Sequence, residues 1–330
     1  MGDPAGVGPE IVIRALQEER VWEVCHPLVV GSKDVLDAAV AEFGGAPVRP
    51  VKDPGAAREV EEAIPLWDTG PVPPPGFVRG RPSPQTGEAA WKVIQETARL
   101  VVEKQVEAMA TAPVSKEAIE SAGIPFTGHT DALAKITGGD AVMFLECGPL
   151  RVAHVTAHVS LRRACDLVTK ERVEKVMRVT LAALRDMGVT KPRVGVAGLN
   201  PHAGEHGLFG TEEAEIIAPV IEALRAEGHG VEGPISPDIV FAFMRAGRYD
   251  AVVAMYHDQG HIPLKTISFH LGPERHLAGV NVTLGLPIVR TSVDHGTAFD
   301  IAWQGKADPQ SMIEAIFLAA RMATARRQKG

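Results

Sequence analysis

Short apolar runs alternate along the chain with segments in which apolar residues recur every three or four positions. The runs have the length of buried strands, and the recurring pattern is typical of amphipathic helices. The apolar runs predict strands at 27–31, 141–147, 151–157, 193–198 and 250–255. The periodic segments predict helices at 9–18, 86–106, 171–187, 211–227 and 309–325. Strands that alternate with helices predict an α/β fold.

Chain length adds a prediction about domains. The 330 residues exceed the roughly 250–300 residues that one hydrophobic core serves, so we expect two packed subdomains. The 33 glycines and 25 prolines divide the chain into short segments, and residues 69–84, with six prolines, predict a loop. No long polar linker marks a domain boundary.

Composition and charge favour a small soluble substrate. The chain has 34 Lys and Arg against 41 Asp and Glu, a net charge of −7, which gives no general basic footprint for nucleic acid or an anionic membrane. No apolar run reaches the roughly 18 residues of a membrane span, and residues 1–10 lack a signal-peptide pattern. We therefore expect a cytoplasmic protein.

The chain has three cysteines, Cys25, Cys147 and Cys165. An odd number without a C-x-x-C pair indicates neither a disulfide framework nor a thiolate zinc site. We expect all three to be buried apolar residues.

Three of the twelve histidines, His158, His202 and His257, stand within four residues of the end of a predicted strand. Ligands bind at the carboxyl edge of open α/β sheets, so three imidazoles from three strands could converge on one ion. Three histidines with an open position are a common catalytic arrangement for a divalent metal. The alternative is that each is a structural histidine held by hydrogen bonds.

Other histidine pairs are weaker candidates. His154 and His158 share one face of a strand, whereas His257 and His261 would share a face only in a helix. Asp258 could orient the imidazole of His257 through its second nitrogen, or it could be a turn carboxylate.

Two glycine-rich segments are candidates for a nucleotide- or anion-binding loop. Gly228, Gly230 and Gly233 satisfy G-x-G-x-x-G, but they follow a predicted helix and run into Pro234, so we reject this fingerprint. In the segment 2–10, GDPAGVGPE, the glycines permit close approach of the backbone and a proline suits the first helical position. That segment predicts either an anion-binding loop or a tight turn from strand to helix.

Anion-binding candidates stand near the histidine segments. His129 and Thr130 follow Gly128 at a predicted helix start, and Lys265 and Arg290 lie further along the chain. Arginine binds phosphate or carboxylate oxygens in a bidentate manner, and lysine supplies a compact charge. Each of these residues could equally be a surface ion-pair residue or a helix cap.

Six segments, in order and over essentially the whole chain, resemble the 4-hydroxythreonine-4-phosphate dehydrogenase family. They are 2–10 (GDPAGVGPE), 111–116 (TAPVSK), 126–131 (FTGHTD), 199–205 (LNPHAGE), 255–260 (MYHDQG) and 279–297 (GVNVTLGLPIVRTSVDHGT).

The resemblance implies the isocitrate and isopropylmalate dehydrogenase type of fold, with two α/β/α subdomains and a cleft between them. We expect residues 1–125 with 285–330 to form one subdomain, and 126–284 to form the other, with the metal ligands and dimer contacts. The resemblance also implies a homodimer that shares its active site across the interface, and use of NAD or NADP without a Rossmann glycine fingerprint. No nucleic-acid or membrane partner is expected.

The resemblance also assigns residues. A divalent metal ion, Zn, Mg, Mn or Co, is placed on His158, His202 and His257, with His257 reaching it from the partner subunit. The implied substrate contacts are His129, Thr130, Lys265, Asn281 and Arg290. Lys265 is the candidate for substrate anion binding or proton transfer, and Asp258 is a weaker candidate for acid–base work.

The implied reaction is oxidation of the secondary hydroxyl of a 4-phosphorylated four-carbon hydroxy acid, followed by decarboxylation, as a step of pyridoxal phosphate biosynthesis. The metal would lower the pKa of the hydroxyl, hydride would pass to the nicotinamide, and the metal would stabilise the enolate formed as carbon dioxide leaves. The expected substrate is 4-hydroxythreonine 4-phosphate.

Three features depart from the family pattern. Met1 directly precedes Gly2 where the family has a short strand, so either the start is internal or that strand is missing. The segment 266–280 is longer than expected and could reshape the pocket or act as a lid. Segments 206–210 and 261–263 are more similar to the relatives that oxidise D-threonate or D-erythronate 4-phosphate, which are the alternative substrates.

Two functions of other classes remain open. One is a metal-dependent lyase or hydrolase, in which the histidines activate water without a nicotinamide. The other is an inactive ligand-binding homologue.

Overall fold

A computed structural model describes residues 1–268 and 278–329. The chain divides into two compact units and enters the first of them twice. The first unit comprises Met1–Ala141 and Leu286–Ala323, and the second comprises Val142–Gly285 and Thr324–Gly330. Residues 126–141, which the sequence analysis assigned to the second subdomain, group with the first unit. Most of the segment 266–280, for which the sequence suggested either a reshaped pocket or a lid, lies outside the described residues.

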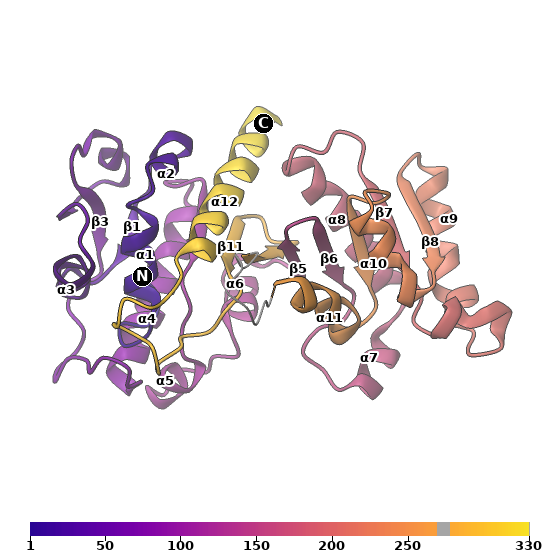
Figure 1. Ribbon diagram of the computed structural model, residues 1–330, viewed down its shortest axis with the longest axis horizontal. Coiled ribbons are helices and arrows are strands. Elements are labelled where there is room, and N and C mark those ends of the chain that lie inside the picture. The colour runs from indigo at the N-terminus through magenta and orange to yellow at the C-terminus, as the bar shows by residue number, and fades with distance from the viewer. Residues whose placement is uncertain (269–277, 330) are drawn as a thin grey trace. The chain divides into compact units, whose positions relative to one another are not determined.

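The first unit contains parallel strands. β1 (Val29–Gly31) and β2 (Val48–Pro50) each pair with β3 (Ile64–Asp68). β4 (Ala108–Thr111) pairs with β11 (Val289–Val293), and this register places Arg290 opposite Met109. Of these strands, β1, β3 and β11 are labelled in Figure 1.

Helices surround these strands. They are α1 (Gly8–Ala15), α2 (Glu19–Val24), α3 (Lys33–Phe43), α4 (Pro84–Val102), α5 (Lys116–Ser121), α6 (His129–Thr137) and, up to Ala323, α12 (Gln310–Lys329), with a short 3-10 turn at Pro54–Glu59. α4 begins two residues before its predicted start because Ser83 and Thr86 form a capping box and Pro84 occupies the first turn. The proline-rich segment before it is a loop, as predicted.

The second unit is built on a sheet whose described strands follow the order β10-β5-β6-β9-β7-β8. They are β10 (Gly279–Leu284), β5 (Val142–Cys147), β6 (Leu150–His154), β9 (Ala251–Ala254), β7 (Arg193–Ala197) and β8 (Gly230–Ile235). β10, β5 and β6 are antiparallel neighbours, whereas β6, β9, β7 and β8 run parallel. β9 is buried throughout, as expected for a central parallel strand.

Helices also pack on this sheet. They are α7 (Leu161–Leu167), α8 (Lys170–Asp186), α9 (Ala218–Ala226), α10 (Pro237–Arg245) and α11 (His257–Ser268), with a 3-10 segment η2 (Pro201–Gly207) and a π-helix η3 (Glu213–Ile217). α8 buries a stripe of residues at helical spacing that includes Val173, Val176, Met177 and Leu181. α10 and α11 pack on the central strands (Figure 1), around a core that includes Val252.

The α/β prediction is confirmed. The predicted strands are present as β1, β5, β6, β7 and β9, and the predicted helices as α1, α4, α8, η3 with α9, and α12. The rejected glycine fingerprint lies in the turn after α9 and on β8. The prediction for Cys165 is wrong, because this cysteine is exposed on α7, whose buried residue is Ala164. Cys147 is buried and Cys25 is partly buried.

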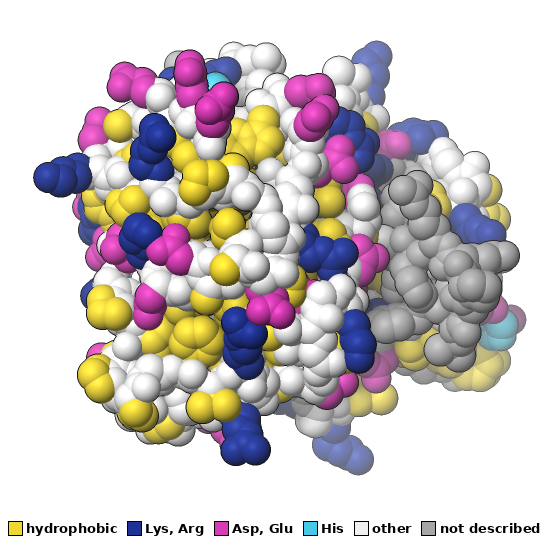
Figure 2. Space-filling view, turned by 60° about the vertical axis from the view of Figure 1, so that its left-hand side comes forward, with side chains coloured by type: hydrophobic (Ala, Val, Ile, Leu, Met, Phe, Trp, Pro, Cys, Tyr) yellow, Lys and Arg dark blue, Asp and Glu magenta, His cyan; other side chains and the backbone are white. Residues whose placement is uncertain are grey.

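None of the described helices is long and apolar enough to cross a membrane. On the face shown in Figure 2, acidic and basic side chains are intermixed among apolar ones. This distribution agrees with the modest net charge of −7.

Candidate functional site

The predicted metal histidines follow three neighbouring parallel strands. β6, β9 and β7 lie side by side in that order, and His158, His257 and His202 respectively come after their carboxyl ends. The side chain of His257 is 33% exposed, and His158 and His202 are exposed. All three imidazoles are therefore attached to the same edge of the second unit's sheet, where ligands of open α/β sheets bind.

Four imidazoles, which we call the histidine cluster, lie close together at this edge: His154, His158, His257 and His261. The ring centroids of His158 and His257 are 5.5 Å apart. His257 stacks on His261 with a centroid distance of 3.7 Å and an interplanar angle of 11°. These two share a face because their segment is helical, and α11 begins at His257.

His154 is the buried member of the histidine cluster, with 1% of its surface exposed. Its Nδ1 lies 3.4 Å from the carbonyl oxygen of Met143, and its Nε2 lies 3.2 Å from Nδ1 of His261. A carbonyl can only accept, so Nδ1 carries the proton and Nε2 is the acceptor for His261. Burial, with repulsion from His261 as a smaller cause, lowers the pKa of His154 to about 3, so this ring is neutral.

Two residues of α11 fix the helix against the strand ends. A Cβ added to Gly260 would overlap the imidazole of His154, so only glycine permits this close approach. The Gln259 amide accepts from the backbone N–H of Met255 at 2.6 Å and donates to the carbonyl of Gly198 at 2.8 Å. Gln259 thereby joins the end of β9 to the end of β7.

His202 lies in an unusual backbone turn after β7. Residues 202–206 all have positive φ, from 41° to 80°, in a conformation that residues with a Cβ rarely adopt. The His202 ring lies 6.3 Å from the ring of Phe209, which is itself exposed. Consecutive left-handed residues of this kind persist only where the surroundings hold them.

The described residues do not form a complete metal site within one chain. Among them, no group of three or more His, Cys, Asp or Glu side chains is placed to hold a metal ion. Within one chain the rings of His158 and His257 are neighbours, and the ring of His202 lies beside Phe209.

Three further predicted residues also belong to the second unit. Lys265 follows His257 and His261 at intervals of four residues on α11, so the three form one stripe. Asp258 is 73% exposed at its side chain, and its Oδ1 lies 2.7 Å from Nδ1 of His257. Asn281 is partly buried on β10.

The first unit holds the other predicted substrate contacts. Arg290 lies on β11 with 6% of its surface exposed, and its Nη2 donates to Oγ1 of Thr111 at 2.8 Å. Burial lowers the pKa of Arg290 to about 10, so the guanidinium remains charged at neutral pH. Desolvation and the nearby charge of Arg290 hold the pKa of His129 well below its usual value. His129 and Thr130 begin α6, where backbone N–H groups point outward.

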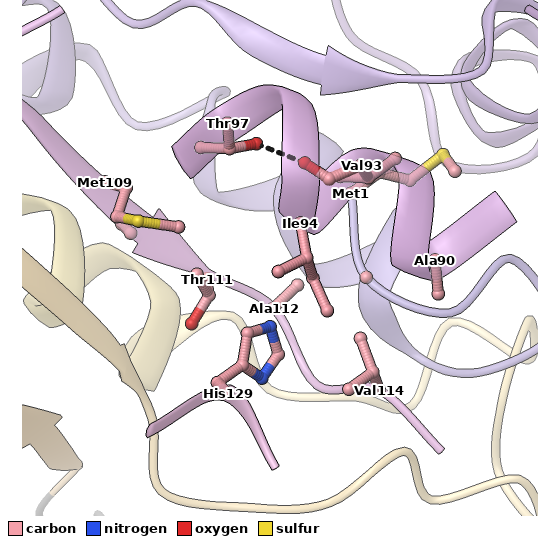
Figure 3. Close-up of a pocket in the computed structure, with 12 residues that line it drawn as sticks. Met1, Ala90, Val93, Ile94, Thr97, Met109, Thr111, Ala112, Val114 and His129 are labelled. Carbon is pink, nitrogen blue, oxygen red and sulfur yellow. Dashed lines mark hydrogen bonds between the residues drawn. The ribbon is translucent and has the colours of Figure 1, made fainter. Parts of the chain in front are cut away.

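A small cavity of about 30 Å³ lies beside this group (Figure 3). Its lining is mainly apolar, and Thr111 and His129 contribute polar atoms. The His129 ring points toward Ala112 in Figure 3, and Thr97 donates to the carbonyl of Val93 at 2.7 Å on another wall. The volume has room for ordered water.

The loop at 2–10 is a packed turn. The N–H of Ala5 donates to Oδ1 of Asp3, that of Gly6 donates to the Asp3 carbonyl, and that of Val7 donates to the carbonyl of Thr297. Pro9 stands in the first turn of α1, as predicted. Because these amides already donate within the chain, the structure favours a tight turn over an anion-binding loop.

Sequence reasoning missed two residues that organise the strand ends, Gln259 and Glu213. Gln259 stands in a recognised motif, but its bond to Gly198 spans 61 positions. Glu213 is 5% exposed and accepts backbone N–H bonds from the segment before His202. No local pattern signals either role, since both depend on contacts between segments.

Comparisons with known proteins agree with this architecture. Residues 23–319 match the family described as pyridoxal phosphate biosynthetic protein PdxA. The chain is 46% identical to a 4-hydroxythreonine-4-phosphate dehydrogenase of Geobacter metallireducens, over 98% of this chain and 94% of the relative. It is 44% identical to a D-threonate 4-phosphate dehydrogenase of Pectobacterium atrosepticum, over 98% of both chains. A crystal structure of 4-hydroxythreonine-4-phosphate dehydrogenase from Klebsiella pneumoniae superposes with a TM-score of 0.83 at 43% identity, covering 98% of this chain and 96% of that one.

These relatives are all dehydrogenases, and the fold is shared over nearly the whole chain, so the protein is an oxidoreductase. The chain belongs to the pyridoxal phosphate biosynthetic protein PdxA family. The resemblance found in the six sequence segments is thereby confirmed.

Proposed function

We propose that the protein is an NAD(P)-dependent dehydrogenase that oxidises the secondary hydroxyl of a 4-phosphorylated four-carbon hydroxy acid, with subsequent loss of carbon dioxide. The favoured substrate is 4-hydroxythreonine 4-phosphate, named for the Geobacter relative, and the second candidate is D-threonate 4-phosphate, named for the Pectobacterium relative. The structural observation that carries the proposal is the buried cation of Arg290 beside Thr111 and His129.

A buried guanidinium favours an anionic ligand. Removing the Arg290 charge from water costs free energy, and bonds to phosphate or carboxylate oxygens would offset that cost. His129 is neutral and can donate a hydrogen bond without adding charge next to Arg290. The first turn of α6, with His129 and Thr130, offers N–H groups and the positive end of the helix dipole to an anion.

The second unit would bind the ion that assists oxidation. We assign His158, His202 and His257 as its ligands, with the set completed across a homodimer. Once bound, a divalent ion would lower the pKa of the hydroxyl and a nicotinamide would accept the hydride. The Asp258 carboxylate favours the proton on Nδ1 of His257, which leaves Nε2 free to coordinate. Lys265 would bind a substrate anion or transfer a proton.

A substrate panel tests this proposal. The purified protein is assayed with 4-hydroxythreonine 4-phosphate, D-threonate 4-phosphate, D-erythronate 4-phosphate and their unphosphorylated forms, each with NAD and with NADP. We expect reduced cofactor to appear only with a phosphorylated acid, together with one carbon dioxide per cofactor reduced. The ranking of kcat/KM identifies the substrate.

Metal dependence is tested in the same assay. Treatment with EDTA should abolish activity, and Mn²⁺, Zn²⁺, Mg²⁺ or Co²⁺ added back should restore it. Full activity after chelation would contradict the assignment of the three histidines. Absence of reduced cofactor with every phosphorylated acid would contradict the dehydrogenase proposal itself.

A further inference from the structure

The turn that carries His202 rests on one buried carboxylate. Oε1 of Glu213 accepts from the backbone N–H of Leu199 and of Asn200, each at 2.7 Å. Oε2 of Glu213 accepts from Nδ2 of Asn200 at 3.0 Å. The same Nδ2 also donates to Glu212 at 2.7 Å. Glu213 is thus the acceptor for the two residues at which the chain leaves β7 and enters the turn.

Glycines make room for this carboxylate. A Cβ on Gly204 would lie 2.7 Å from Oε2 of Glu213, and a Cβ on Gly198 would lie 3.0 Å from Oε1 and 2.8 Å from Cα of Ala203. The loop backbone therefore lies directly against the carboxylate. A side chain at either glycine would push the turn away.

Glu213 opens a π-helix, Glu213–Ile217, that continues into α9. Such π segments are rare and recur at functional sites, because the extra residue in the turn displaces side chains from their ordinary positions. Here the π-helix begins at the residue that turns its carboxylate toward the His202 loop. Glu215, on the same short segment, is exposed.

The non-glycine residues of the turn need external support. His202, Ala203, Glu205 and His206 all have left-handed backbone angles, which are less stable than right-handed ones for residues with a Cβ. Without an anchor the turn would relax and the His202 imidazole would move. Bonds from N–H groups to a buried carboxylate are strong enough to supply that anchor.

We propose that Glu213 is a positioning residue, whose carboxylate holds the left-handed turn 202–206 and so fixes the direction of the His202 imidazole. This inference rests on the proposed function, in which His202 binds the divalent ion. Glu213 itself touches neither substrate nor cofactor in this scheme.

The test compares Glu213→Gln with Glu215→Gln. A glutamine at 213 retains one acceptor oxygen, but its NH₂ group would face the donor Nδ2 of Asn200. In metal-free protein we expect the amides of Leu199 and Asn200 to exchange hydrogen roughly 10–100-fold faster in E213Q, and the rate of His202 modification by diethyl pyrocarbonate to change. The Mn²⁺ concentration for half-maximal activity should rise roughly 10–100-fold, as for other residues that orient metal ligands. E215Q should match the wild type in all three measurements.

The outcomes separate this inference from the proposed function. Unchanged amide exchange in E213Q would overturn the role of Glu213. So would faster exchange if the Mn²⁺ requirement and the rate of His202 modification both stay unchanged. If the wild type oxidises none of the phosphorylated acids, the proposed function fails. The role of Glu213 is then decided by the two measurements in metal-free protein, amide hydrogen exchange and the rate of His202 modification. If E213Q does not fold, Glu213→Asp, which keeps the charge but shortens its reach, is measured against the same criteria.

Discussion

Arg290 is charged, buried and hydrogen-bonded to Thr111. Replacing it therefore distinguishes a role in substrate binding from a role in the stability of the fold. Arg290→Met removes the cation and keeps a side chain of similar length. We expect KM for the phosphorylated substrate to rise roughly 10–100-fold, because charge-assisted bonds to the substrate anion are lost. The melting temperature should change little, because loss of the hydrogen bond to Thr111 and relief of the desolvation cost of the buried guanidinium oppose each other.

Steady-state kinetics and a thermal melt of the same Arg290→Met preparation provide the measurement. Arg58→Met is the matched control, because Arg58 is 63% exposed and pairs with Glu107 on the surface. An unchanged KM in the Arg290 variant would show that this cation does not hold a substrate anion.

His154 gives the protein a pH-dependent stability. The unfolded chain takes up a proton on this residue below a pKa of about 6.5, whereas the folded pKa is about 3. The unfolded state therefore binds more protons in acid, and the contribution of His154 to stability is lost as the pH falls from about 6.5 toward 3. Between pH 7 and pH 5 we expect a loss of about 2 kcal/mol in the free energy of unfolding from this residue.

Urea unfolding in EDTA at pH 7 and pH 5 measures this effect without metal binding. His154→Phe changes absolute stability, so the difference between the two pH values is the quantity to compare. The variant should lose about 2 kcal/mol less than the wild type over this range. An equal pH dependence in both proteins would contradict a neutral, buried imidazole at 154.

At the scale of elements, the placement of α11 depends on Gly260. Gly260→Ala introduces a Cβ that overlaps the His154 imidazole, so α11 must shift away from β6. We expect a loss of roughly 1–3 kcal/mol in the free energy of unfolding, typical of overpacking. Chemical denaturation provides the measurement. Gly296→Ala is the control, because a Cβ there meets no atom within 4 Å, and equal stability of the two variants would contradict this packing.

The sequence predicted β9, α8 and even the three-residue β1, but not the helices α3 and α11, which have 11 and 12 residues. β9 was predictable because a strand buried on both faces has a continuous apolar run. α8 was predictable because a helix buried along one face has apolar residues every three or four positions. α7, with one buried residue, has almost no such pattern, which is also why Cys165 was wrongly expected to be buried. The helix predicted at 211–227 begins as a π-helix, because Glu213 is held by bonds to another segment.

The candidate site was predictable to a similar extent. Strand-end positions singled out His158, His202 and His257. Each predicted strand also locates its own carboxyl end, and ligands of open α/β sheets bind at that edge. The links made by Gln259 and Glu213 were not predictable, because each polar residue finds its partner on a different segment. Backbone angles such as the left-handed φ of His202 likewise leave no mark in residue type.

At the scale of the whole molecule, the proposed homodimer has a direct test. His202→Ala and His257→Ala homodimers are each expected to be inactive. If His257 acts in the partner's site, mixed dimers contain one intact site, and a randomised equal mixture should recover about a quarter of wild-type activity. The alternative is a site whose three histidines all come from one chain. The 5.5 Å between the ring centroids of His158 and His257 in one chain suggests this alternative.

Subunit exchange by denaturation and joint refolding, followed by the dehydrogenase assay, makes this measurement. Wild-type protein taken through the same procedure sets the recoverable activity. Mixed dimers that remain inactive would place all three histidines of a site in a single chain.

The double entry of the chain into the first unit has a consequence for synthesis on the ribosome. Thr111 and Arg290, whose side chains bond between β4 and β11, are 179 positions apart. At about 5–20 residues per second, translating that interval takes roughly 10–40 s. Throughout this delay β4 lacks the strand that pairs with it, while the nascent second unit emerges and can fold first. We therefore expect a folding intermediate during synthesis in which the first unit is incomplete because β11 has not yet been translated.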